Sequence, residues 1–149
     1  MEELSDLMKF PSEEYWEWKP IVKEPGLIAP GSTYGIVDEK GCGYFFYCLI
    51  VSTSPDVKIC IDMYADGVIE VKDTIKELEQ GGASASSIFK ICRYDDFTPI
   101  YVVEIAPGVT GFPGIPFRGY NKMWLENTAK TPIYVPVVTG WLIKLKEGS

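Results

Sequence analysis

The stretch VKICIDMY at residues 57–64 decides the fold class, because every second side chain in it is apolar. A period of two is typical of a β-strand with one buried face. Asp66-Gly67 follows directly, and residues 68–71, VIEV, continue with strand-forming side chains. Asp-Gly between two such runs favours a hairpin, because glycine tolerates a positive φ and Asp bonds its own backbone. We therefore predict a β-hairpin over residues 57–71.

Asp62 and Asp66 have a second interpretation, as ligands of a metal ion. A calcium loop needs several oxygen ligands at close spacing, and this segment supplies only part of that pattern. We therefore interpret Asp66 as a turn residue and Asp62 as part of the polar side of the strand. No metal, and no other cofactor, is predicted from the sequence.

Other strand signals lie on both sides of this hairpin. Residues 42–53, CGYFFYCLIVST, have aromatic and β-branched side chains on both faces, which predicts a central strand. Residues 122–127 alternate in the same way as the hairpin, and residues 132–145 form one long strand or two strands broken near Gly140. A short helix is expected over residues 72–80, capped by Asp73 or Thr74.

The fold class that follows is all-β, with two antiparallel sheets in a jelly-roll-like sandwich and one or two short helices. The spacing of strands and turns assigns this sandwich to residues 33–149. Residues 1–32 are expected to be an N-terminal arm, with a short helix that Ser5 caps and an extended segment.

Composition narrows the classes of function. The 149 residues carry a net charge of −7, which disfavours nucleic-acid binding, because the phosphate backbone is itself negative. No apolar run reaches the roughly 18 residues of a membrane span, and the acidic N-terminus lacks the apolar core of a signal peptide. We therefore expect no membrane partner and a location in the cytoplasm.

Catalytic signals are weak. The chain has no histidine, so Ser-His-Asp triads, Cys-His dyads and histidine-ligated metals are excluded. Asp62, Glu104 and Glu126 are the carboxylates that a hydrolase on this scaffold would use, but the sequence does not bring two of them together. We expect a protein that is not an enzyme. The four cysteines have apolar neighbours and are expected to be buried, and the sequence does not select a disulfide pair.

The elements follow one another in a characteristic order. An aromatic strand, KGCGYFFYCLIVST, precedes the alternating strand VKICIDMYADGVIEV, then a short helix, TIKELEQGG. A proline-rich stretch reaches GIPF, and the hairpin MWLENTAKTPIYVPVVTGWLIKL closes the chain. Over about residues 33–146, this order resembles small β-sandwich virion proteins of tailed phages and archaeal viruses, and phage-like relatives encoded in cellular genomes, which implies a virion as the alternative location. The resemblance implies a structural or attachment role in a particle, as a symmetric homo-oligomer, with a trimer as the first expectation and other virion proteins as further partners.

Exposed aromatic residues are the candidate contacts of such a protein. The arm carries two tryptophans that pack on their own domain or on a neighbouring subunit, and the proline-rich loop carries apolar side chains. The candidate contact residues for an oligomer or ligand are Tyr15, Trp16, Trp18, Phe112, Phe117 and Tyr120.

A carbohydrate-binding or receptor-attachment module is the alternative, in which aromatic rings stack on the sugars of a glycan. Its candidate rings are Tyr15, Trp16, Trp18, Tyr120 and Trp124. Against it, the strand positions of Trp124 and Trp141 favour a place in the core for both.

Overall fold

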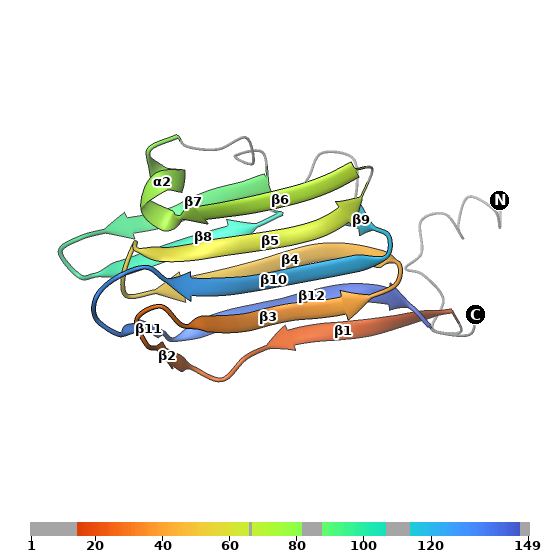
Figure 1. Cartoon of the computed structure of the whole chain (residues 1–149), viewed down its shortest axis with the longest axis horizontal. Helices are drawn as coiled ribbons and strands as arrows, with labels where there is room; N and C mark the ends of the chain where they lie inside the picture. Colours follow the sequence, from red (N-terminus) through yellow and green to blue (C-terminus); the bar gives the residue numbers. More distant parts are fainter. Residues whose placement is uncertain (1–14, 66, 82–87, 107–113, 147–149) are drawn as a thin grey trace.

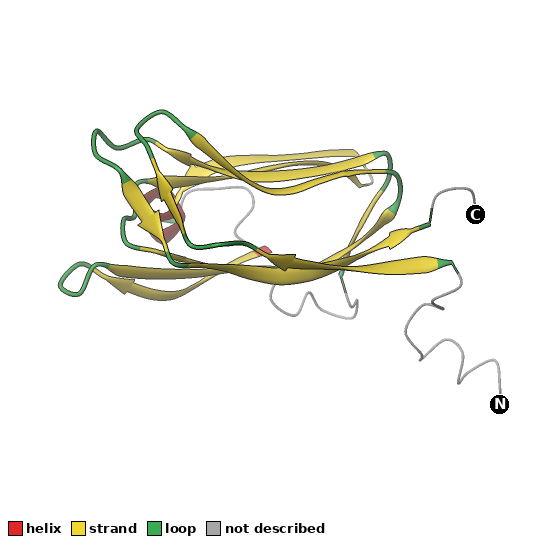
Figure 2. Ribbon diagram, turned by 90° about the horizontal axis from the view of Figure 1, so that it is seen from below, coloured by secondary structure: helices red, strands yellow, loops and turns green. Residues whose placement is uncertain are grey.

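The computed structural model describes residues 15–65, 67–81, 88–106 and 114–146. These residues form two larger antiparallel sheets, whose strands run along the long axis of the molecule (Figure 1). Turned by 90°, the molecule is a two-layer sandwich (Figure 2). The predicted all-β sandwich is confirmed.

The strands vary from three to ten residues in length. Their bounds are β1 (Trp16–Val22), β2 (Gly26–Ile28), β3 (Thr33–Lys40), β4 (Gly43–Ser52), β5 (Val57–Ala65), β6 (Gly67–Thr74), β7 (Phe89–Asp95), β8 (Ile100–Ile105), β9 (Ile115–Phe117), β10 (Tyr120–Asn127), β11 (Ile133–Val135) and β12 (Val137–Leu145). The helix α2 (Ile75–Glu79) follows β6.

The sheet order is that of a jelly roll. The six-stranded sheet has the order β1-β12-β4-β8-β7, with β9 also paired to β4, and the four-stranded sheet has the order β3-β10-β5-β6. When β7 and the three-residue strands are left out, eight strands remain. Numbered along the chain, strands 1, 8, 3 and 6 of these eight form one sheet (β1-β12-β4-β8), and strands 2, 7, 4 and 5 form the other (β3-β10-β5-β6). This arrangement arises when a long hairpin folds over into two layers. The short strands β2 and β11 pair separately.

The predicted hairpin is present as β5 and β6. The two strands pair in antiparallel register from Lys58↔Thr74 to Ala65↔Gly67. Gly67 has a φ of 113°, a conformation that favours glycine. The four alternating apolar residues of β5 point between the sheets and are fully buried: Val57, Ile59, Ile61 and Met63. Asp62 lies on the opposite, outward side of the strand.

A helix is confirmed at the end of this hairpin, although it spans Ile75–Glu79 and residues 72–74, which were expected in it, belong to β6. Thr74 caps it, because its hydroxyl accepts a hydrogen bond from the Glu77 amide while the Glu77 carboxylate accepts one from the Thr74 amide. Ile75 and Leu78 turn inward and are buried. The helix therefore covers one end of the sandwich.

A cluster of charged residues joins the two sheets along one side. Glu39 on β3 of the four-stranded sheet pairs with Lys19 on β1 at 3.2 Å and with Lys144 on β12 at 3.4 Å. A hollow of about 370 Å³ opens between β1 and β3 at this point. Because one carboxylate of the four-stranded sheet bridges two ammonium groups of the six-stranded sheet, we assign this cluster to holding the sheets together.

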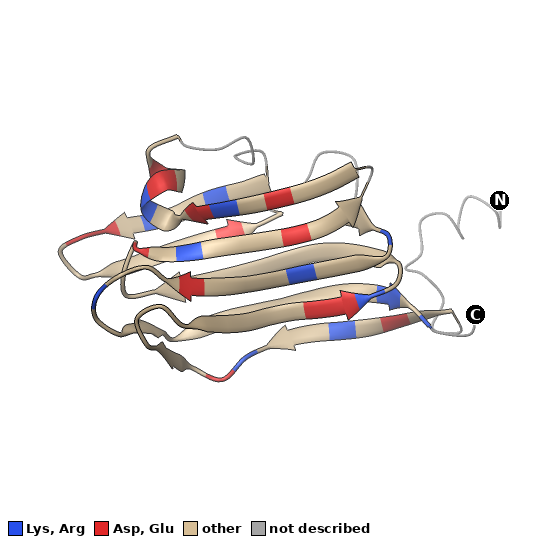
Figure 3. Ribbon diagram, viewed as in Figure 1, with Lys and Arg blue, Asp and Glu red and all other residues tan. Residues whose placement is uncertain are grey.

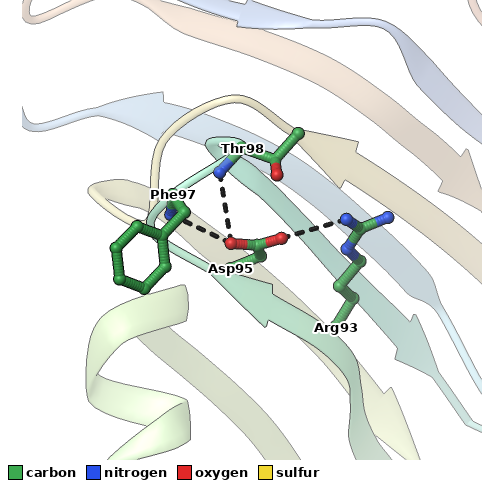
Figure 4. Close-up of polar contacts among 4 residues, drawn as sticks. All are labelled: Arg93, Asp95, Phe97 and Thr98. Carbon is green, nitrogen blue, oxygen red and sulfur yellow. Dashed lines mark hydrogen bonds and ion pairs between the residues drawn. The ribbon is translucent and has the colours of Figure 1, made fainter.

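The hairpin between β7 and β8 is stabilised at its turn by one carboxylate (Figure 4). Asp95 accepts hydrogen bonds from the amides of Phe97 and Thr98 at 2.9 and 3.1 Å, and it pairs with Arg93 at 3.0 Å. These contacts hold the pKa of Asp95 at about 2, with the Arg93 hydrogen bond as the largest cause. These contacts fix the ends of the β7–β8 turn relative to one another.

Two segments differ from expectation. Residues 16–28 lie within the arm that we expected, yet β1 pairs along its whole length with β12, and β2 pairs with β11. The C-terminal run breaks at Pro136, between β11 and β12, and not near Gly140. Proline lacks the amide that a continuing strand needs. The helix expected near Ser5 lies outside the described residues.

Candidate functional site

The outer surface of the six-stranded sheet is the most unusual feature of the molecule. Strands β1, β12 and β4 each turn alternate side chains away from the sandwich, and many of these are aromatic. We call this surface the aromatic face. Its rings are Trp16 and Trp18 of β1, Tyr44, Phe46 and Tyr47 of β4, and Trp141 of β12.

The six rings form three pairs. The centroids of Trp16 and Tyr44 lie 5.6 Å apart, those of Trp18 and Phe46 lie 6.0 Å apart, and those of Tyr47 and Trp141 lie 5.2 Å apart. In the first two pairs, a ring from β1 meets a ring from β4 across the intervening strand β12. Such contacts add to the stabilisation that burial of the rings provides.

Ile143 lies beneath these rings. It pairs with Trp18 on one side and with Tyr44 on the other. Its exposed fraction is only 1%, although it is not part of the core between the sheets. The aromatic layer therefore covers apolar surface on the outside of the sandwich, as a thin second core.

A bulge in β4 produces this arrangement. Trp141 pairs with Tyr47, while the next residue, Leu142, pairs with Phe45, so Phe46 is an extra residue in its strand. Because of the bulge, Phe46 and Tyr47 both reach the aromatic face, while Phe45 remains fully buried. Next to the bulge, a Cβ at Gly140 would collide with the carbonyl oxygen of Tyr47 and lie 2.8 Å from the Cα of Cys48.

Part of the aromatic face remains exposed to solvent. Trp18 is 43% exposed and Trp141 is 42% exposed. Val22 and Val137, at the other end of the paired strands β1 and β12, are also exposed. Contiguous exposed apolar surface of this kind is typical of an interaction site.

Two uncharged groups, the Cys92 thiol and the Tyr47 hydroxyl, lie at the border of the aromatic face next to Glu104. The Cys92 thiol donates a hydrogen bond to Glu104 at 2.7 Å, and burial followed by this bond raises the thiol pKa. Burial, with Glu104 as the next cause, raises the pKa of Tyr47 to about 12. Both groups are therefore neutral near pH 7, and the charged side chains at this border are Glu104 and its cross-strand neighbour Lys90.

The outer surface of the four-stranded sheet has the opposite character, and we call it the polar face. It carries Lys58, Asp62, Glu70, Lys72, Lys122 and Glu126 around the ring of Trp124. Figure 3 shows the charges along these strands, whereas β4 of the other sheet has none. Trp124 itself is held by polar contacts, with its indole donating to Glu126 at 3.0 Å and Lys72 lying 5.9 Å from its ring centre.

The predicted contact residues do not form one site. Trp16 and Trp18 belong to the aromatic face, and Tyr15 next to them is 51% exposed. Tyr120 lies on the four-stranded sheet, within the polar face. Phe117 was expected at a contact surface, which is wrong: β9 pairs with β4, and the ring is 1% exposed in the core. Phe112 lies outside the described residues.

Sequence reasoning missed four of the six rings. Trp141 was expected in the core and is exposed, and Tyr44, Phe46 and Tyr47 could not be assigned to a face. Trp124, also expected in the core, is half-buried on the polar face. The available signal was that Trp141, Ile143 and Leu145 stand two residues apart and therefore share one face of β12.

The expected carboxylates are also separated. Asp62 and Glu126 lie on the polar face, whereas Glu104 borders the aromatic face on the other side of the sandwich. Among the cysteines, Cys48 and Cys60 are buried as expected, but Cys42 and Cys92 are exposed, and all four are free thiols.

Comparisons with known proteins identify no family. No protein-family model matches the chain, and no curated protein matches its sequence. Across the described ranges, no helix is long and apolar enough to cross a membrane.

Proposed function

We propose that this protein is a non-enzymatic structural component that associates with copies of itself through the aromatic face, as part of a virion or phage-like particle. The observation that carries the proposal is the set of three ring pairs on an outer sheet surface, with Trp18 and Trp141 more than two-fifths exposed. Tryptophan and tyrosine are enriched at the centres of protein interfaces, where they account for much of the binding energy.

The chemistry of the aromatic face favours a protein partner over a sugar. A sugar needs several hydrogen bonds to its hydroxyl groups in addition to stacking, because polar groups left unpaired on binding are costly. The outward side chains of β12 include only one polar residue, Thr139, between Val137 and Leu145. An apolar, nearly uncharged surface is satisfied best by another apolar surface.

The aromatic face would form the centre of an interface between copies. Strands lie about 4.8 Å apart and rise about 3.3 Å per residue, so the three strands that carry the rings present about 430 Å² in projection. A standard interface buries about 800 Å² on each partner, so the aromatic face would account for about half of one. Because a repulsive net charge of −7 acts between copies, the attraction must come from an uncharged patch such as this one.

The architecture supports the proposal more weakly. Jelly rolls build viral capsids, but they also occur in lectins and enzymes, so the topology does not select a function by itself. The resemblance of the element order to virion proteins points in the same direction as the aromatic face. Sandwich subunits of this kind assemble by closed symmetry, for which a trimer remains the first expectation.

Sedimentation velocity across a concentration series tests the proposal. The wild-type protein should sediment as a discrete oligomer at high micromolar concentration. The double variant Trp18→Lys/Trp141→Lys should sediment as a monomer, because two buried charges at the centre of the interface oppose association. Tyr134→Lys is the matched control, since Tyr134 is 44% exposed on the short strand β11, and it should leave the oligomer intact. A wild-type monomer throughout the series would refute the proposal.

A further inference from the structure

The polar face contains a hollow that the proposed assembly does not use. It has a volume of about 320 Å³ and is lined by Lys40, Asp62, Gly119, Tyr120 and Lys122. This volume is at the lower end of the range of small-molecule pockets, about 300 to 1,000 Å³. The hollow lies on the sheet opposite to the aromatic face, so it remains accessible when the aromatic face is covered.

The register of three neighbouring strands builds this hollow. Tyr120 on β10 is paired with Lys40 on β3, and Lys122 on β10 is paired with Asp62 on β5. Because residues two apart on a strand share a face, Tyr120 and Lys122 point to the same side. Gly119, with a φ of 87°, forms the turn at the rim, and its carbonyl accepts a hydrogen bond from the amide of Gly41. The lining groups therefore stand on paired backbone.

The hollow combines hydrogen-bond donors, an acceptor and a ring. Burial, followed by the nearby Asp62 carboxylate, raises the pKa of Tyr120, so its hydroxyl is a neutral group beside that carboxylate. In the described part of the chain, no carboxylate oxygen lies within 4.0 Å of the ammonium nitrogen of Lys40 or Lys122. Two ammonium groups are thus available to a ligand beside one carboxylate.

The charges define the class of ligand. The lining carries two positive groups and one negative group, in a chain whose net charge is −7. A ligand with one negative charge therefore fits better than a neutral or cationic ligand. Asp38 and Glu70 lie next along the same row, beside Lys122 and Asp62 respectively, and they disfavour polyanions such as nucleic acid.

We propose that this hollow binds a single acidic sugar residue, such as a uronic acid. The sugar carboxylate pairs with Lys40 and Lys122, because charge-assisted hydrogen bonds are the strongest contacts available there. Sugar hydroxyls donate to the remaining oxygen positions of Asp62. The apolar face of the sugar ring packs against the aromatic ring of Tyr120. This site is independent of the proposed self-association, because it shares no residue with the aromatic face.

Ligand-observed saturation-transfer NMR with the full chain tests this inference. The probes are methyl β-glucuronide, methyl β-glucoside and cyclohexanecarboxylate, which carry the charge and the hydroxyls together, the hydroxyls alone and the charge alone. The glucuronide should bind in the millimolar range, and the other two should bind about tenfold more weakly, as expected when one charged contact or several hydroxyl contacts are lost.

Variants locate the site. Lys40→Ala and Lys122→Ala should each weaken glucuronide binding about tenfold. Asp62→Asn should reduce the preference for glucuronide over cyclohexanecarboxylate. Lys130→Ala is the control, because Lys130 is an exposed lysine in the turn between β10 and β11, and it should bind as the wild type does. Absence of glucuronide binding, or binding that both Lys40→Ala and Lys122→Ala leave unchanged, would overturn the inference.

The result is separable from that of the assembly experiment. The Trp18→Lys/Trp141→Lys variant should retain glucuronide binding even as a monomer, since the hollow lies within one chain. Loss of binding on dissociation would contradict the independence of the two surfaces.

Discussion

Antiparallel strands form both outer faces of the sandwich, but only one of the two faces is polar enough to be well hydrated. On the polar face, most outward positions carry a charge, an amphipathic ring or a small group, with the exposed Val68 as an exception. Several of these groups contact one another. On the aromatic face, the outward positions of β4 and β12 are mostly apolar, as the inward ones are. Strands with both faces covered are apolar on both faces, which is why we propose a partner for the aromatic face and none for the polar face.

The difference shows why alternation alone predicts fold better than function. Alternation assigned β5 and β10 to a half-buried sheet, and the structure confirms both. The same rule does not assign the side chains of β4 to one face or the other, because four consecutive aromatic residues have no period of two. Three of the six rings of the aromatic face belong to this strand.

The largest expected effect comes from breaking the bulge that creates the aromatic face. Gly140→Ala introduces a Cβ that collides with the Tyr47 backbone. Because backbone cannot move aside as a side chain does, we expect a loss of at least about 3 kcal/mol in the free energy of unfolding, measured by urea denaturation.

Gly35→Ala is the matched control for this bulge variant. Gly35 stands beside a similar register shift between β3 and β10, but nothing lies within 4 Å of the position of its added Cβ. Its unfolding free energy should change by less than about 1 kcal/mol, as is usual for an unobstructed surface site. Equal losses for both variants would show that the bulge of the aromatic face has no special steric demand.

The next effect measures how well the aromatic layer acts as a core. Ile143→Ala removes a side chain that is 1% exposed beneath the rings. If the layer shields Ile143 as the main core does, the loss should be about 2 to 4 kcal/mol, the range for buried isoleucine. A loss near zero would mean that the rings move inward to fill the space. Chemical denaturation followed by tryptophan fluorescence reports the result.

A smaller loss of unfolding free energy is expected when a cysteine is replaced, and it should differ between Cys60 and Cys92, which lie on opposite sides of the sandwich. Cys60 points to the polar face, yet it is fully buried, and burial followed by the Glu126 charge raises its pKa to about 12. Cys92 borders the aromatic face and is exposed. Cys60→Ala should cost about 1 kcal/mol in unfolding free energy, the scale of a small buried truncation, and Cys92→Ala close to nothing.

Thiol labelling provides an independent check on this comparison. A disulfide reagent at pH 8 should modify Cys92 well before Cys60, because reaction requires both access and a thiolate. Faster labelling of Cys60 would show that the side chains covering it on the polar face open readily.

The sequence predicts structural features that are determined by neighbouring residues, and it does not predict those that depend on pairing between distant strands. The hairpin, the Thr74 cap and the alternation of β10 are determined by neighbours within a few residues, and all three are found. The burial of Phe117 depends on pairing with Gly43, more than seventy residues earlier, so no local signal was available. The hollow around Tyr120 likewise depends on the register of three strands.

The smallest effect compares the half-buried carboxylate of Asp95 with the exposed carboxylate of Glu77, one associated with each sheet. Asp95 caps the turn of the β7–β8 hairpin, and Glu77 completes the capping box of α2 next to β6 (Figure 4 shows Asp95). The pKa of both is lowered by hydrogen bonds, that of Asp95 to about 2, chiefly by Arg93. A carboxylate with a lowered pKa stabilises the fold above its unfolded value, near 4, and loses that contribution as the pH falls through its folded pKa.

The direction of the pKa shift determines the pH range in which the melting temperatures should be compared. Asp95→Asn should lower the melting temperature slightly at pH 7, and the difference from wild type should shrink as the pH falls from about 4 towards 2, where Asp95 becomes protonated. Arg93→Gln should raise the lower limit of that pH range. The Arg93 hydrogen bond is the largest cause of the lowered pKa of Asp95, so its removal moves the folded pKa back towards the ordinary value. A pH-independent difference between Asp95→Asn and wild type would place the role of this side chain in its shape and not in its charge.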